Sequence, residues 1–208
     1  MNLAEPTIRH DDIGASLSQI AIQSELALGE ADVSPGTANA LGRIATTSRE
    51  LVESMGDIVW AINPDRDRVG DLLQRMRYFA SDTLTGKNIE FSFRAPDTGR
   101  DLALATEVRR EVLLIFKEAV NNIARHARCA HADIDVRVER GGLVVQVADD
   151  GQGLSEAVAR GNGHGLASME ARARRLNARL DIETRAGGGT RLVLHVPWRV
   201  ASHAYLSR

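Results

Sequence analysis

The sequence predicts an α+β protein in which a helical hairpin precedes a mixed α/β domain. Apolar residues recur at helical spacing over residues 10–62, and from residue 89 onward segments with period two alternate with helical ones. With 43% hydrophobic residues, the 208-residue chain can also bury a core. We expect helices over residues 1–85, an α/β domain over 86–200 and a tail over 201–208.

The first part reads as three helices. Residues 10–29 carry Ile13, Leu17, Ile20 and Ala27 at helical spacing, and a turn rich in Gly and Pro separates them from a second helix over 37–62. Steps of three and four residues make a heptad seam on the second helix, interrupted at Ser48: Leu41, Ile44, Leu51, Met55, Ile58 and Ile62. Such a seam favours a partner, so we expect a four-helix bundle in a homodimer.

The remaining elements follow in order. Asn63-Pro64-Asp65 ends the second helix, and a third helix is expected over 69–85. Strands are predicted at 89–94, 132–139, 143–148, 180–184 and 190–196, with helices at 105–127 and 166–176. We assign the boundary between the two parts to Gly86, where the composition changes.

Composition excludes several function classes. The net charge of −2 argues against nucleic acid or an anionic membrane as the main partner, and one cysteine excludes a disulfide framework. The longest apolar runs reach about five residues, whereas a membrane span needs about 20. We therefore expect no membrane insertion and a cytoplasmic chain, with any input domain lying elsewhere. Only Lys87 and Lys117 are lysines, which disfavours a P-loop.

Three separated motifs could build one nucleotide site. Glu118 and Asn122 lie four residues apart on a helix, so they share a face and offer the hard oxygen ligands that Mg²⁺ prefers. The second motif, Asp149-Asp150-Gly151-Gln152-Gly153, follows an apolar strand, where a carboxylate can accept from an exocyclic amine and glycines allow close approach. Taken singly, a solvated helix face and a hairpin turn explain these two motifs better.

The third motif, residues 161–166, places glycines ahead of a helix. Backbone N–H groups at such a helix start form an anion cradle that needs no lysine. In this order and spacing the three motifs resemble the N, G1 and G2 boxes of the GHKL (Bergerat) ATP-binding fold, which histidine kinases, Hsp90, type II topoisomerases and mismatch-repair ATPases share. Gly187-Gly188-Gly189-Thr190 is similar to a fourth element of that fold.

The first part narrows the resemblance. His10-Asp11-Asp12-Ile13-Gly14 is similar to the His-Asp-x-x-Gly phosphoacceptor motif of sensor histidine kinases of the nitrate-sensor and lipid-fluidity-sensor type. Residues 55–64 resemble the second bundle helix of these kinases, and 118–127 and 163–169 match their ATP site.

This resemblance implies a two-component kinase core that uses ATP and Mg²⁺. His10 would attack the γ-phosphorus, Asp11 would orient the imidazole or take its proton, and a response-regulator receiver domain would accept the phosphoryl group. Asp149 would receive the adenine amine, and Asn122 with Glu118 would hold Mg²⁺; Glu118 is also a catalytic candidate. The other predicted nucleotide-binding residues are Gly151, Gly153, Gly163, His164, Gly165, Leu166 and Thr190.

Two positions depart from the family pattern. Pro6 would kink a continuous helix at a cost of about 3 kcal/mol, so we expect the first helix to start there, with His10 near a frayed end. Ala15 stands four residues after Asp11, where many of these kinases carry a Gln that positions water for dephosphorylation of the receiver. We therefore expect weak phosphatase activity.

Two other functions stay open at this point. One is a non-catalytic ATP-binding dimerisation module whose His10 is not phosphorylated, and the other is a GHKL ATPase in which Glu118 activates water. The cluster Arg172, Arg174 and Arg175 is expected to be a solvated helix face, with contact to phosphate or a partner domain as the alternative.

Overall fold

The computed structural model describes residues 10–29, 33–63, 66–97, 101–153, 164–185 and 187–198. The chain divides into two compact units, residues 1–62 and residues 63–208, and each is described by itself. The predicted helix start at Pro6 and the tail at 201–208 lie outside the described residues. None of the helices in the described ranges combines the length and the apolar character needed to span a bilayer.

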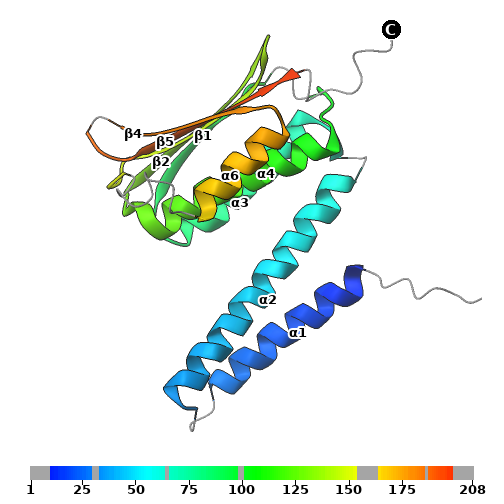
Figure 1. Ribbon diagram of the computed structural model, residues 1–208, viewed down its shortest axis with the longest axis vertical. Helices are drawn as coiled ribbons and strands as arrows, with labels where there is room; N and C mark the ends of the chain where they lie inside the picture. Colours follow the sequence, from blue (N-terminus) through cyan, green and yellow to red (C-terminus); the bar gives the residue numbers. More distant parts are fainter. Residues whose placement is uncertain are drawn as a thin grey trace, which may run out of the picture. The chain divides into compact units, whose positions relative to one another are not determined.

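Unit 1 is a helical hairpin of α1 (His10–Leu28) and α2 (Pro35–Ile62), as Figure 1 shows. Most of its buried side chains are small: Ala21 and Ser24 on α1, and Ala45, Ser48 and Ala61 on α2; Asp57 on α2 is buried as well. Ser24 donates its hydroxyl to the Ile20 carbonyl at 2.8 Å, which satisfies a polar group buried in the hairpin. Small side chains let the two helices pack closely, but they bury little apolar area.

Helix α2 starts two residues before the predicted position. Ser34 accepts the Thr37 amide at 3.2 Å, and Pro35 occupies the first helical position, where its missing N–H costs nothing. The helix ends at Ile62, as predicted from the Asn63-Pro64 sequence.

The large apolar residues of unit 1 lie on its outside. Ile44, Leu51 and Ile58, three members of the predicted seam, are exposed, whereas Ser48, the polar interruption, is buried. On α1, the exposed large residues are Ile13, Ile20, Ile22, Leu26 and Leu28. The hairpin alone therefore leaves half of the predicted apolar seam exposed, while Leu41 and Met55 are half-buried.

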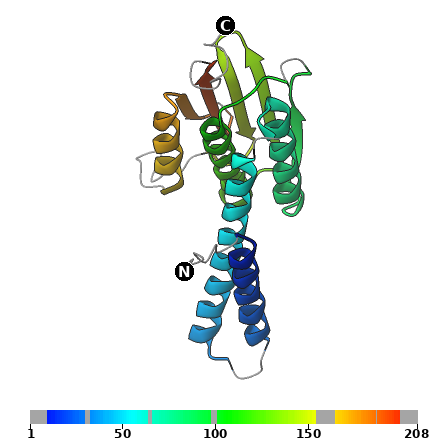
Figure 2. The same cartoon turned by 90° about the vertical axis from the view of Figure 1, so that its right-hand side faces the viewer.

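Unit 2 contains a five-stranded mixed sheet in the order β1-β2-β3-β5-β4. The strands are β1 (Glu90–Arg94), β2 (His131–Glu139), β3 (Gly142–Asp149), β4 (Arg179–Thr184) and β5 (Thr190–Pro197). Only β1 and β2 are parallel, joined through α4 (Thr106–Asn122). Helices α3 (Val69–Thr85), α4 and α6 (His164–Arg175) cover one face of the sheet (Figures 1 and 2).

Alternation along the strands separates the two faces of the sheet. Ile134, Val147 and Leu192 occupy paired positions on β2, β3 and β5 and are buried against the helices. On the other face, charged residues pair across strands, as in Arg191 with Glu183 at 3.2 Å and Arg94 with Asp133 at 3.4 Å. One face of the sheet therefore belongs to the core, and the other carries charged pairs, although the central strand β3 is buried on both faces.

Helix α3 belongs to unit 2, which moves the boundary from Gly86 to the Ile62–Asn63 junction. The apolar stripe of α3, including Leu72 and Met76, is buried, and Phe79 meets Phe116 of α4 edge to face with ring centroids 6.5 Å apart. Periodicity locates such a stripe but does not reveal which domain it faces.

A buried arginine fixes the start of unit 2. Arg109, on α4, is 1% exposed and donates to the carbonyls of Asn63, at 3.2 Å, and Arg66, and to the Thr106 hydroxyl at 3.3 Å. Burial lowers the pKa of its guanidinium, while the charges of Asp67 and Asp71 oppose that shift. Arg109 thus holds the segment after α2 against the helix that also carries Glu118 and Asn122.

Candidate functional site

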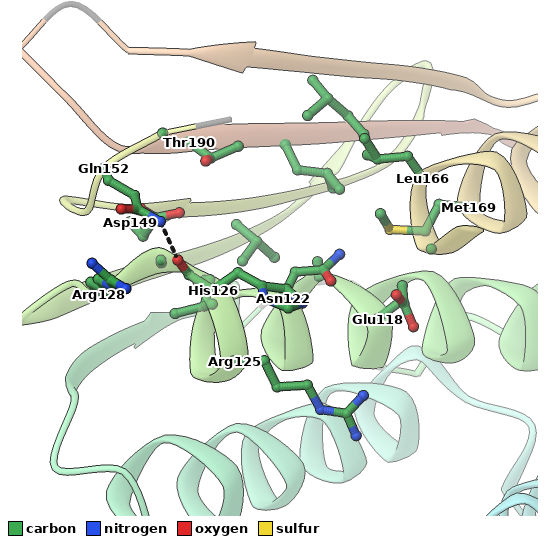
Figure 3. A pocket seen from close by; sticks show the side chains of 18 residues that line it. Glu118, Asn122, Arg125, His126, Arg128, Asp149, Gln152, Leu166, Met169 and Thr190 are labelled. Atoms are coloured by element: carbon green, nitrogen blue, oxygen red, sulfur yellow. Dashed lines mark hydrogen bonds between the residues drawn. The ribbon is translucent and has the colours of Figure 1, made fainter. Parts of the chain in front are cut away.

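A cavity of about 480 Å³ lies in unit 2 between the helices and the sheet (Figure 3). It takes residues from all three predicted motifs and from the segment around Thr190. The lining residues are Glu118, Ala119, Asn122, Ile123, Arg125, His126, Ala127, Arg128, Val147, Asp149, Gln152, Gly153, Gly165, Leu166, Met169, Ile182, Thr190 and Leu192.

Three strands supply a continuous apolar side to the cavity. Leu192 pairs with Val147 on one neighbouring strand and with Ile182 on the other, so the three side chains form a row across the sheet. None of the three predicted motifs includes these residues. The signal was present, because Val147 lies two residues before Asp149 and Leu192 two after Thr190, and such positions share a sheet face. An apolar row of this kind suits the face of a flat ring.

Asp149 places a buried carboxylate beside that row. It is the last residue of β3 and is 3% exposed, and its Oδ1 accepts the Gly151 amide at 2.9 Å. A buried carboxylate needs hydrogen-bond donors, and a ligand amine in the cavity can supply a further one. This geometry fits the predicted role of Asp149.

The helix carrying the first motif ends differently from the prediction. Residues Ile123–Ala127 form a π-helical turn, η2, and Arg128 follows in the left-handed region at φ 52°. Gln152 donates hydrogen bonds to two carbonyls of this turn. Its backbone amide donates to the Ala127 carbonyl at 2.9 Å, and its side-chain amide donates to the His126 carbonyl at 2.9 Å (Figure 3). The π-helical turn therefore connects the end of α4 to the loop after Asp149 through two hydrogen bonds.

Gly151 is required by this close approach. A Cβ at Gly151 would lie 2.1 Å from the Ala127 carbonyl oxygen, so no other residue fits without a backbone shift. Gly153, with φ +77°, lines the cavity, and a Cβ there would meet Thr184 at 2.7 Å. Both predicted glycines of the second motif thus have a packing role; Gly153 lines the cavity, whereas Gly151 is not among the lining residues.

Asp150 does not line the cavity, unlike Asp149, and its carboxylate instead binds the backbone. Its Oδ1 accepts the amides of His131 at 2.9 Å and Ala130 at 3.0 Å. These hydrogen bonds, that from His131 foremost, lower the pKa of Asp150. Nearby, burial raises the pKa of the Cys129 thiol, and the charges of Asp149 and Asp150 add to that rise. Asp150 therefore fixes the start of β2 relative to the end of β3.

The β4–β5 hairpin supports Asp149 from the other side. Gly187, Gly188 and Gly189 all have positive φ, and a Cβ at Gly189 would lie 2.0 Å from the Asp149 carbonyl oxygen. Arg185 also donates to that carbonyl at 3.1 Å. Without a Cβ, Gly189 can pass close to the Asp149 carbonyl, and the next residue, Thr190, lines the cavity.

Glu118 and Asn122 lie on the cavity side of α4, as predicted from their spacing, and point toward the sheet and α6 in Figure 3. In the part of the chain that the structure describes, no group of three or more His, Cys, Asp or Glu could hold a metal ion. Two oxygen donors beside an open cavity fit Mg²⁺, which takes one or two protein ligands together with phosphates and water.

The remaining predicted residues divide into three groups. Gly165 and Leu166, in the first turn of α6, line the cavity. His164 begins α6, but its side chain and all of Gly163 lie outside the described residues. His10 and Asp11 form the start of α1 in unit 1, and their side chains are likewise outside the description.

Two protein families match separate parts of the chain. Residues 10–67 match the family described as "Histidine kinase", and residues 107–200 match "Histidine kinase-, DNA gyrase B-, and HSP90-like ATPase". The first match contains His10 and Asp11, and the second contains every residue that lines the cavity.

Two curated relatives are sensor kinases. The chain is 25% identical over 83 residues to the signal transduction histidine-protein kinase/phosphatase DegS of Brevibacillus brevis and 26% identical over 98 residues to the sensor histidine kinase LiaS of Bacillus subtilis. These matches cover 40% and 47% of this chain but only 22% and 27% of the relatives.

Solved structures share the fold. The histidine kinase domain of the blue-light activated kinase EL346 of Erythrobacter litoralis has a TM-score of 0.58 at 19% identity, covering 90% of this chain and 95% of that one. The Acinetobacter baumannii histidine kinase AdeS has a TM-score of 0.57 at 14% identity, with 88% and 94% covered.

Proposed function

The chain belongs to the sensor histidine kinases of two-component systems, and on that premise we propose that it is the cytoplasmic kinase core of such a protein. In this proposal it binds Mg-ATP, autophosphorylates His10 and passes the phosphoryl group to an aspartate of a response-regulator receiver domain. The observation that carries the proposal is the buried carboxylate of Asp149 beside an apolar row in a cavity open to ligand.

Asp149 supports adenine as the base. An exocyclic amine donates a hydrogen bond to a carboxylate, whereas a ring that presents a carbonyl there would leave two acceptors facing each other. Val147, Ile182 and Leu192 offer an apolar surface for the ring. A base lacking the amine would leave the buried carboxylate without that donor and bind more weakly.

The phosphates would lie toward the other end of the cavity. Glu118 and Asn122 would hold Mg²⁺, which when bound bridges phosphate oxygens and neutralises the charge that develops during transfer. The first turn of α6, where Gly165 and Leu166 line the cavity, presents backbone N–H groups suited to an anion. Backbone N–H groups can bind phosphate without a lysine, which suits a chain that contains only two lysines.

His10 would be the nucleophile. A ring nitrogen of its neutral imidazole forms the new P–N bond to the γ-phosphorus while the bond to the leaving oxygen breaks, releasing ADP. Histidine with an unperturbed pKa near 6.5 is mostly neutral at cytoplasmic pH. Asp11 would orient the ring or accept its proton.

The exposed apolar residues of the hairpin support a homodimer. Ile44, Leu51 and Ile58 are exposed on α2 of a single chain, and a second copy would cover them in a four-helix bundle. The large exposed side chains of α1 are available for the same purpose.

One experiment separates this function from its two alternatives. The protein is incubated with γ-labelled ATP and Mg²⁺, and wild type, His10→Gln and Asp149→Asn are compared. Acid-labile, alkali-stable label on wild type that disappears in both variants supports the kinase. Nucleotide binding without label supports the non-catalytic module, and free phosphate that survives His10→Gln supports an ATPase.

A further inference from the structure

A buried carboxylate joins α4 to α6 outside the cavity. Glu111, on α4, is 1% exposed, and its Oε2 lies 3.0 Å from Nη1 of Arg172, while Oε1 lies 3.6 Å from Nη1 of Arg175. Arg174, between them in sequence, is 71% exposed and pairs with Glu170 on its own helix. The arginine cluster is therefore not a uniformly solvated face, because two of its members turn toward α4.

Glu111 needs these arginines. A carboxylate removed from water is costly unless opposite charges and hydrogen bonds surround it, and Arg172 supplies a charge-assisted hydrogen bond. Arg110, at 3.4 Å, is a third cation near the same group. Such a buried cluster adds little net stability. It disfavours other arrangements of α4 and α6, because they would leave the Glu111 carboxylate buried without an opposite charge.

The opposite end of α6 contacts the same helix. A Cβ at Gly165 would lie 2.1 Å from Oε1 of Glu118, so the first turn of α6 rests against that carboxylate. Glu111 and Glu118 are seven residues apart, two helical turns or about 10 Å along α4. Helix α6 thus runs antiparallel to α4, with an acidic group at its N-terminal end and its own arginines paired at its C-terminal end.

The residues between these two contacts form a wall of the nucleotide cavity. Leu166 and Met169 line it, whereas Glu111, Arg172 and Arg175 do not. A shift of α6 along α4 would move Leu166 and Met169 together, because they lie on one rigid helix.

We propose that Glu111 is a positioning residue of the nucleotide site, acting through Arg172 and Arg175 to hold α6 in the register that completes the cavity. This inference rests on the proposed function, since it assumes that the cavity takes a nucleotide. Loss of the contact leaves the cavity complete in only a fraction of molecules, and the apparent affinity falls by that fraction.

The test compares Arg172→Gln with Arg174→Gln in the full chain, using Mg²⁺ and a fluorescent ATP analogue. We expect Arg172→Gln to raise the Kd about tenfold, while Arg174→Gln leaves it within about twofold. Glu111→Gln is a second route to the same loss. Label incorporation at saturating ATP stays near the wild-type rate in both arginine variants, so the effect appears in KM and not in kcat. Arg172→Lys, which keeps the charge, recovers most of the affinity.

Hydrogen exchange gives a readout that does not depend on nucleotide. Amides of α6 are expected to exchange faster in Arg172→Gln than in Arg174→Gln, because only the first loses its contact with α4. Equal nucleotide affinity in Arg172→Gln and wild type overturns the positioning role, and so does an equal loss in both arginine variants. If the wild-type protein binds no nucleotide, both the proposed function and this inference are wrong.

Discussion

The two units differ in where they place their large apolar side chains. In unit 2, Phe116, Ile134 and Met169 are buried between the helices and the sheet, whereas in unit 1 Leu26 is 69% and Leu51 is 47% exposed. A hairpin that buries alanines and serines between its helices is incomplete by itself, while unit 2 already encloses its core. We therefore propose that unit 1 is completed by a partner, whereas the cavity of unit 2 is built within one chain.

The largest effect is expected in unit 2, at Asp149. Asp149→Asn should weaken Mg-ATP binding about thirtyfold or more, equivalent to about 2 kcal/mol. The Asn oxygen would accept the Gly151 amide, as Oδ1 of Asp149 does, so its NH2 group would face the adenine amine with a donor. Titration with a fluorescent ATP analogue measures this loss. Asp150→Asn is the matched control, since it retains the oxygen that accepts the Ala130 and His131 amides. Similar losses in both variants would contradict the assignment of the two aspartates.

The proposed dimer contact of unit 1 can be disrupted separately, at the exposed residues of its seam. Leu51→Glu should raise the dissociation constant of the dimer about a hundredfold, because each copy would bury a charge without a partner. Sedimentation velocity over a concentration series checks the result. Thr46→Glu adds the same charge at an exposed position on the opposite side of α2 from Leu51 and should leave the dimer intact. ATP-analogue affinity should not change in either variant, since the cavity lies within one chain.

The close packing around the cavity predicts a stability effect confined to unit 2. Gly151→Ala should destabilise that unit by about 1–3 kcal/mol, because its Cβ would collide with the Ala127 carbonyl. Unfolding followed by Trp198 fluorescence in a Trp60→Phe background reports on unit 2 alone. Gly141→Ala, at a glycine with open space around it, is the control. An unchanged unfolding midpoint for Gly151→Ala would show that the π-helical turn yields easily.

The smallest effect is expected at Ala15, which is exposed on α1. Ala15→Gln should speed dephosphorylation of a cognate phospho-receiver by about threefold, since a side-chain amide could orient the attacking water. Ala15→Leu, similar in length but without an amide, should leave the rate unchanged. Loss of phosphate from the labelled receiver measures both. No increase with Gln would mean that Ala15 does not limit this activity.

Local patterns predicted most elements of both units, and the cavity contains the key residues of each predicted motif. The exceptions share a cause. The last turn of α4 continues into η2, whose His126 and Ala127 carbonyls accept hydrogen bonds from Gln152, a residue distant in sequence. The cavity residues Val147, Ile182 and Leu192 were not singled out because their role depends on strand register, although strand alternation pointed to two of them.

The sequence by itself determined the order and type of the elements, the heptad seam of α2 and the identities of Asp149, Glu118 and Asn122. Side-chain spacing encodes these features directly, because helix and strand periods act over a few residues. Tertiary structure alone decided that α3 packs on α4 in unit 2, that three residues of the seam lie exposed on the hairpin and that Arg172 reaches Glu111. These outcomes depend on which buried surfaces meet, and residues 61 positions apart carry no local sign of their pairing.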